Sequence, residues 1–154
     1  MEVFKTFIFI SVFMFSFSSL FASQYESILD QKDYIRFFKL STEYEKYKKK
    51  IEDLIEKNRI HNLKLSDLKE IESLLEKTNS IVDEIYPKYS DNPVIKSQFY
   101  QIRFEIEETK KIISNLKKNF QKRSYLRENI YKIEYYLFRM NVYLKGISQN
   151  LSTL

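Results

Sequence analysis

Few residues in this chain are of a type that does chemistry. The 154 residues contain a single His, a single Gly and no Cys. Catalysis by a Ser-His-Asp arrangement needs a His held by a carboxylate beside a nucleophile. The only His lies in Arg59-Ile60-His61-Asn62, where a polar residue in a turn between helices is the simpler interpretation. The absence of Cys excludes disulfides and thiolate chemistry, and the isolated Gly146 excludes a glycine-rich phosphate loop.

The carboxylates do not indicate a metal centre either. A di-metal site in a helical bundle needs Glu residues and Glu-x-x-His pairs that face the core, and no Glu-x-x-His occurs in the sequence. The acidic residues avoid the apolar seams. Glu105, Glu107 and Glu108 are followed by Lys110 and Lys111, so we expect a solvated face on which opposite charges pair, as Glu107 and Lys111 would. We predict no catalytic, cofactor-binding or metal-binding residue.

Basic residues gather around one predicted turn. The whole chain has a formal net charge of +5, and opposite charges are interspersed through most of it. In contrast, no acidic residue occurs from residue 115 to residue 127. At the end of a bundle such a cluster would suit anionic lipid head groups, where each cation contributes roughly 1 kcal/mol, or an acidic protein; a solvated turn is the alternative. The cluster consists of Lys117, Lys118, Lys122, Arg123 and Arg127.

The segment 126–151 carries apolar residues on more helical faces than any other. Its heptad seam consists of Leu126, Ile130, Ile133, Leu137, Met140, Leu144, Ile147 and Leu151. A second stripe, which we call the outer stripe, lies nearly opposite and consists of Tyr131, Tyr135, Phe138 and Val142. Tyr125, Tyr136 and Tyr143 form a third stripe on one flank. The outer stripe is either wrapped by the chain's own helices or is a face where a partner docks.

The elements that would position these groups are all predicted to be helices. Residues 24–58 show a helical but uneven pattern, with a kink or short break predicted at 40–43, where Thr42 and Glu45 fit a capping box. The next helix is predicted to begin with Ser66 as its N-cap and to end before Pro87.

Residues 87–92 are the clearest loop, because Asp91-Asn92-Pro93 supplies a cap followed by Pro at the first helical position. The following helix keeps an unbroken heptad pattern from residue 95 to Phe120. From Phe120 to Leu126 the heptad phase breaks, which favours a tight turn between antiparallel helices. One continuous helix with a phase slip is the alternative.

These elements define an all-α fold. With one Gly and two Pro, the chain lacks the turn residues that a sheet-rich fold needs. We predict a coiled-coil-like, antiparallel bundle of about four helices in a single domain, residues 23–154. It would consist of two long hairpins, 24–86 and 93–151, joined by the loop 87–92.

The first 22 residues are typical of a signal peptide, with Lys5 followed by an apolar run and small residues up to Ala22. The apolar stretch is shorter than the roughly 20 residues that span a bilayer comfortably, so we expect cleavage; retention as an anchor is the alternative. We expect an extracytoplasmic protein, periplasmic or secreted, that is not lipid-anchored through Cys.

The leading functional expectation is a non-enzymatic protein of the bacterial cell envelope that acts by helix-mediated protein–protein association, with itself or with another component. The outer stripe would be the partner-binding face. The alternative is a peripheral protein that binds anionic lipid through the basic cluster. Export argues against a nucleic-acid partner.

Overall fold

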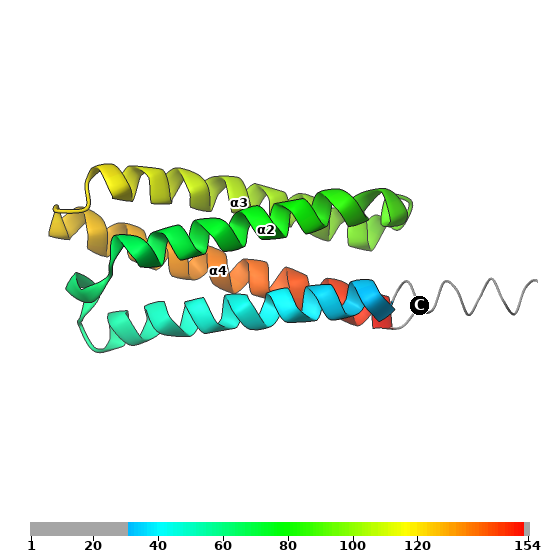
Figure 1. Ribbon diagram of the computed structural model, residues 1–154, viewed down its shortest axis with the longest axis horizontal. Coiled ribbons are helices and arrows are strands. Elements are labelled where there is room, and N and C mark those ends of the chain that lie inside the picture. The colour runs from blue at the N-terminus through cyan, green and yellow to red at the C-terminus, as the bar shows by residue number, and fades with distance from the viewer. Residues whose placement is uncertain (1–30, 153–154) are drawn as a thin grey trace, which may run out of the picture.

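The computed structural model describes residues 31–152 as a bundle of four long helices, with no strand in that range. They are α1 (residues 31–56), α2 (Leu65–Tyr89), α3 (Pro93–Lys118) and α4 (Arg123–Ser152), and the short 3₁₀ helix η1 (Ile60–Asn62) lies between α1 and α2. Successive helices run in opposite directions (Figure 1). The predicted all-α antiparallel bundle of two hairpins is confirmed. The predicted signal peptide, residues 1–22, lies outside the described residues.

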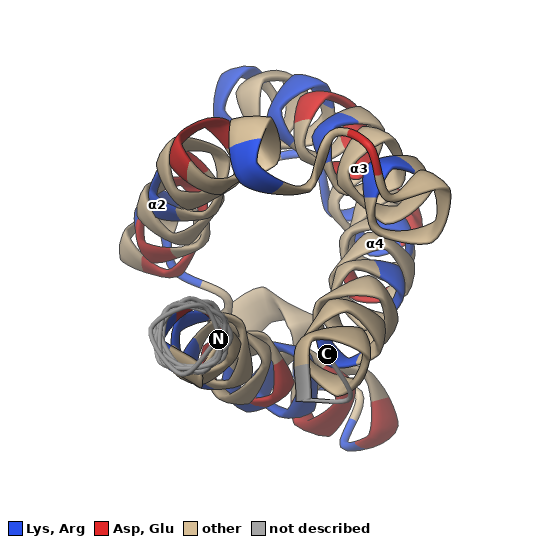
Figure 2. Ribbon diagram, turned by 90° about the vertical axis from the view of Figure 1, so that its right-hand side faces the viewer, with Lys and Arg blue, Asp and Glu red and all other residues tan. Residues whose placement is uncertain are grey.

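The helices form a closed ring in which α4 returns to α1. Figure 2 looks along the bundle and shows this ring, with basic and acidic residues interspersed on its helices. At least one polar contact joins each neighbouring pair of helices. In ring order, these contacts are Tyr44 with Thr78, Asp83 with Arg103, Glu105 with Arg139, and Glu45 with Lys145.

The predicted heptad seam of α4 lies in the core. None of its residues, from Leu126 to Leu151, is more than 5% exposed. The seam of α3 is equally buried from Ile95 to Leu116. Because full burial of a large apolar side chain stabilises a protein by roughly 1.5–3 kcal/mol, these seams hold the second hairpin together and fix the direction in which its outer surfaces face. None of the described helices contains a stretch apolar enough to cross a bilayer.

The kink predicted at residues 40–43 is absent, because α1 is continuous there. The hydroxyl of Ser41 donates a hydrogen bond to the carbonyl oxygen of Phe38 at 2.8 Å, and the hydroxyl of Thr42 donates to the same oxygen at 3.1 Å. Side chains that cap helices also make such bonds inside them. Leu40 and Tyr44 are buried, so tertiary packing continues the helix through this segment.

Both predicted ends of α2 were wrong by a few residues. The helix begins at Leu65 after Lys64, whose backbone N–H donates to the carboxylate of Asp67 at 3.0 Å; Ser66 is not the N-cap. At the other end the helix continues through Pro87 to Tyr89, so the loop predicted at 87–92 is shorter. Pro87 lies in the last turn, where its missing N–H costs one hydrogen bond, and burial of Tyr89 keeps that turn in contact with the core.

The two connections that flank α3 follow the sequence pattern. The side chain of Asn92 accepts hydrogen bonds from the backbone N–H groups of Val94 and Ile95, each at 3.1 Å, and Pro93 occupies the first helical turn. At the other end, α3 stops at Lys118 and α4 begins at Arg123. The tight turn is therefore confirmed, and the continuous helix is excluded.

Candidate functional site

Both connections that contain basic residues lie at the same end of the bundle. The α1–α2 connection, which includes η1, and the α3–α4 turn lie beside one another at the left of Figure 1. We call this end the basic tip. It brings the predicted cluster together with Arg59, His61 and Lys64 from the other connection. The sequence analysis did not join the two groups, although the predicted pair of antiparallel hairpins places both connections at one end of a bundle.

Most cations of the predicted cluster have no partner. Lys117 forms an ion pair with Glu72 of α2. In contrast, Lys118, Lys122, Arg123 and Arg127 make no ion pair and no side-chain hydrogen bond within the described residues, and all four are exposed. These four cations therefore form a positive surface at the basic tip that no described acidic side chain pairs with.

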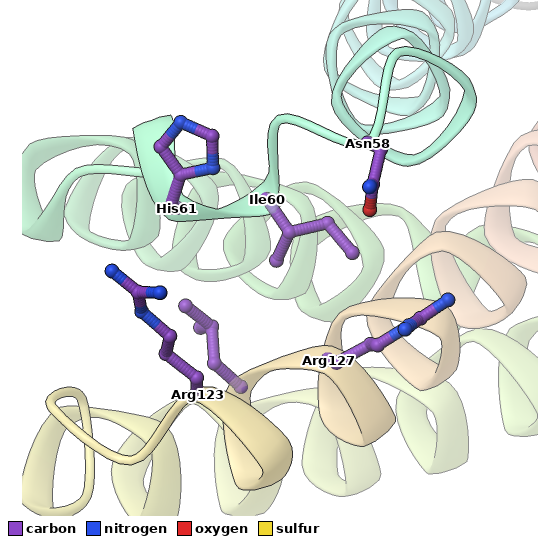
Figure 3. Close-up of a pocket in the computed structure, with 6 residues that line it drawn as sticks. Asn58, Ile60, His61, Arg123 and Arg127 are labelled. Atoms are coloured by element: carbon purple, nitrogen blue, oxygen red, sulfur yellow. The ribbon is translucent and has the colours of Figure 1, made fainter.

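A cavity of about 240 Å³ lies between η1 and the start of α4. We call it the tip cavity. Figure 3 shows Arg123 extending from α4 toward the η1 side and Arg127 lying on the side of Asn58, with Ile60 between the two. The lining residues are Asn58, Ile60, His61, Arg123, Leu126 and Arg127. Ile60 and Leu126 are buried, so the tip cavity combines an apolar floor with a polar and basic rim.

A second hollow, of about 370 Å³, lies against the α3–α4 turn. It is lined by the other three residues of the predicted cluster. Its lining residues are Leu65, Lys117, Lys118, Asn119, Phe120, Gln121 and Lys122. The five predicted basic residues are thus divided between two hollows, and only Arg123 and Arg127 line the tip cavity.

The outer stripe of α4 is exposed. Tyr131, Tyr135, Phe138 and Val142 keep between 44% and 51% of their surface accessible. Cations lie beside two of the rings: the ammonium nitrogen of Lys48 is 5.8 Å from the ring centroid of Phe138, and the guanidinium carbon of Arg139 is 5.5 Å from that of Tyr135. No described helix covers this stripe. The third predicted stripe differs, because its tyrosines are partly buried against the core.

Glu105 corrects the expectation of a solvated acidic face on α3. Its side chain is 0% exposed, and Arg139 Nη2 lies 2.8 Å from Glu105 Oε1. Neither carboxylate oxygen receives a well-aligned hydrogen bond. Burial raises the pKa of Glu105, and the positive charge of Arg139 partly opposes that increase. The heptad pattern missed this burial because residue 105 lies beside the seam of α3, on the flank that α4 covers.

The other acidic residues divide between buried and exposed positions. Glu108, and not Glu107, pairs with Lys111, at 2.6 Å. Asp33 is buried, where it accepts hydrogen bonds from Lys88 at 2.9 Å and from the hydroxyl of Tyr89 at 3.3 Å. Carboxylates outside the heptad seams can therefore still be buried, as Asp33 and Glu105 are. Within the described residues, no group of His, Asp and Glu side chains is arranged to hold a metal ion.

No protein-family model, no curated protein sequence and no solved structure matches this chain.

Proposed function

We propose that this chain is an exported, non-enzymatic protein of the cell envelope that acts by helix-mediated association with a protein partner. The observation that carries the proposal is the exposure of the whole outer stripe of α4. Scattered exposed apolar residues are ordinary on protein surfaces. A row of three aromatic rings and one Val along a single helix is not scattered, and aromatic residues are enriched where proteins bind one another.

The spacing of the stripe favours a helical partner. Tyr131, Tyr135, Phe138 and Val142 follow one another by four, three and four residues. A helix that docks on another helix or in a groove uses this spacing for its anchors. The nearby charges of Lys48 and Arg139 would form a polar rim around an apolar centre. A second copy of this chain carries the same stripe and is the simplest partner of this kind.

Light scattering on the purified protein tests self-association. We expect the wild-type protein to form a dimer or larger assembly, and the double variant Tyr135→Glu/Phe138→Glu to be monomeric, because two carboxylates cannot be buried in an apolar interface without cost. Tyr100→Glu/Phe104→Glu is the matched control, because these two side chains are 52% and 55% exposed but lie on α3. A monomeric wild type, or equal effects of the two changes, would contradict self-association through α4.

A different protein partner would be detected by photo-crosslinking in the cells of origin. A photoreactive side chain placed at position 138 should give a protein adduct, whereas the same group at position 104 should not. Absence of an adduct at position 138, combined with a monomeric wild type, would exclude the outer stripe as a docking face.

The uncompensated charge at the basic tip supports a second candidate function, attachment to an anionic lipid surface. Co-sedimentation with vesicles should require anionic lipid and weaken as salt rises, because salt screens exposed charges. Lys118→Gln/Lys122→Gln should reduce binding. Lys39→Gln/Lys96→Gln removes the same charge from the half of the bundle away from the tip and should not. Equal binding to neutral vesicles would exclude this function.

A further inference from the structure

We infer that the tip cavity is a binding site for a phosphate group, attracted by the Arg123 and Arg127 side chains of α4 that line the cavity and bounded on the other side by the α1–α2 connection. The inference deepens the second candidate function, since it assigns a bounded site within the basic tip. A soluble phosphate ester and a lipid head group carry the same recognised chemistry, so the experiment below separates these two sources.

The charges at the start of α4 are arranged unfavourably for the protein alone. Arg123 and Arg127 are four residues apart on one helix, and like charges at this spacing repel. They also lie near the N-terminal end of α4, where the helix dipole favours anions and disfavours cations. The first turn of α4 contains no acidic residue that would offset them. Arg123 and Arg127 extend to different sides of Ile60 (Figure 3), so an anion bound in the tip cavity would lie near both charges and would offset both effects.

The opposite wall of the tip cavity is built from ordered backbone. Asn58 adopts a left-handed conformation with φ of 50°, which Asn tolerates better than most residues. The N–H of Arg59 donates to the carbonyl oxygen of Leu54 at 2.7 Å, and the N–H of Asn62 donates to that of Arg59 at 2.8 Å. These bonds hold the backbone of Asn58 and His61 at the rim, where Asn58 points toward α4 and the His61 ring points away from it (Figure 3). The backbone of this wall is therefore held in place without a ligand.

Size and charge narrow the ligand class. At about 240 Å³, the tip cavity is smaller than the roughly 300–1,000 Å³ of pockets for drug-sized ligands. It would hold a head group and not a lipid tail. A guanidinium group binds phosphate oxygens through paired N–H donors. The double negative charge of a phosphate monoester matches two guanidinium groups better than the single charge of a carboxylate does.

The test titrates the full-length protein with glycerol 3-phosphate and follows the arginine side-chain signals by NMR. We expect saturable binding with a Kd of about 1 mM, as suits a ligand of few atoms. Arg123→Gln/Arg127→Gln should weaken binding by about tenfold or more, because the charge-assisted hydrogen bonds are lost. Lys118→Gln/Lys122→Gln removes the same charge from the same tip outside the tip cavity, and should change the Kd by less than about twofold. Absence of saturation, or equal weakening in both variants, would overturn the site.

Vesicles distinguish the source of the phosphate. In the lipid arm, the wild type and both double variants are sedimented with phosphatidylcholine vesicles that contain or lack phosphatidic acid. Greater loss of binding in the arginine variant than in the lysine variant supports a lipid head group as the ligand. Selective glycerol 3-phosphate binding without vesicle binding supports a soluble ester, and it would reject the second candidate function while leaving the site intact. Thermal unfolding of each variant verifies that these exposed substitutions leave the bundle folded.

Discussion

Helix α4 carries two apolar stripes with the same heptad spacing, and the bundle buries one and leaves the other exposed. The heptad seam from Leu126 to Leu151 is almost fully inaccessible, whereas the outer stripe keeps about half of its surface. The seam consists of Leu, Ile and Met and the outer stripe mainly of aromatic residues, but both are made of large apolar side chains, so hydrophobicity alone does not explain the difference in burial. The difference arises from the ring of helices, which gives α4 neighbours on its inner face only. An apolar stripe therefore indicates a contact surface, and the number of neighbouring elements decides whether the chain itself covers it.

Polar side chains mark the boundaries between the two stripes. Arg139 reaches Glu105 on the flank toward α3, and Asn141 donates a hydrogen bond to Glu45 on the flank toward α1. Each flank is thus fixed by a polar contact to a different neighbour. Substitutions on either side of these boundaries test whether the two stripes contribute as differently to the free energy of unfolding as their exposure implies.

The largest expected effect on stability comes from the buried residue Leu137, and its exposed neighbour Phe138 provides the comparison. Leu137→Ala should lower the free energy of unfolding by roughly 2–5 kcal/mol, because it removes buried methyl groups and leaves a cavity. Phe138→Ala should lower it by less than about 1 kcal/mol in the monomer, because the Phe138 ring is half exposed. Urea unfolding at low protein concentration measures both. Comparable losses would show that the outer stripe is covered in solution.

The flank toward α3 should respond to pH. Burial raises the pKa of Glu105 above its ordinary value of 4.5. Between these two pKa values, the folded state therefore retains a proton that the unfolded state has released. The stabilisation from this proton is complete below the ordinary pKa and is lost as pH rises through the raised pKa.

Glu105→Gln should therefore raise the free energy of unfolding by about 1–3 kcal/mol at neutral pH, and the difference from wild type should shrink as pH falls through that window. Unfolding of both proteins over a series of pH values measures this. Glu107→Gln, at an exposed position of the same helix, should change stability little. A difference that grows on acidification would contradict the assignment.

The flank toward α1 should tolerate an apolar residue. Asn141 is buried, and its Oδ1 has no hydrogen-bond partner among the described residues. Its partner Glu45 is exposed and can be hydrated instead. Asn141→Leu should raise the free energy of unfolding by about 1 kcal/mol, because it removes a buried unpaired acceptor and adds apolar burial. Thermal unfolding measures the change, with the neighbouring exposed change Val142→Leu as the control. A decrease would mean that the contact with Glu45 stabilises the fold.

The smallest effect is expected where α4 begins. Arg123→Glu should raise the free energy of unfolding by roughly 0.3–1 kcal/mol, because it places an anion near the positive end of the helix dipole. The gain should decrease at high salt. The same change should abolish phosphate binding at the tip cavity, so stability and binding would move in opposite directions. A loss of stability would show that Arg123 stabilises the fold by a contact that its exposed side chain does not suggest.

Local patterns in the sequence were sufficient to predict most of the second hairpin. The cap at Asn92, the unbroken seam of α3 and the break in heptad phase after Phe120 are short-range signals, and the structure follows them. The predictions at residues 40–43 and at Pro87 were wrong, because burial of Leu40, Tyr44 and Tyr89 outweighed weak local preferences.

The candidate sites required information that is not local. The sequence identified both the outer stripe and the basic cluster by residue type and spacing. It did not show that the outer stripe has no covering helix. It also did not show that Glu105 is buried against Arg139, or that the α1–α2 connection faces Arg123 and Arg127.

The sequence by itself therefore determined the helices, their apolar faces and their antiparallel order, because periodicity and capping act within a few turns of one chain segment. Only the tertiary structure decided which faces are covered and which side chains of the two connections line the tip cavity. Those outcomes depend on contacts between residues far apart in the sequence, such as His61 and Arg123 beside the tip cavity, and no local pattern specifies such a pair.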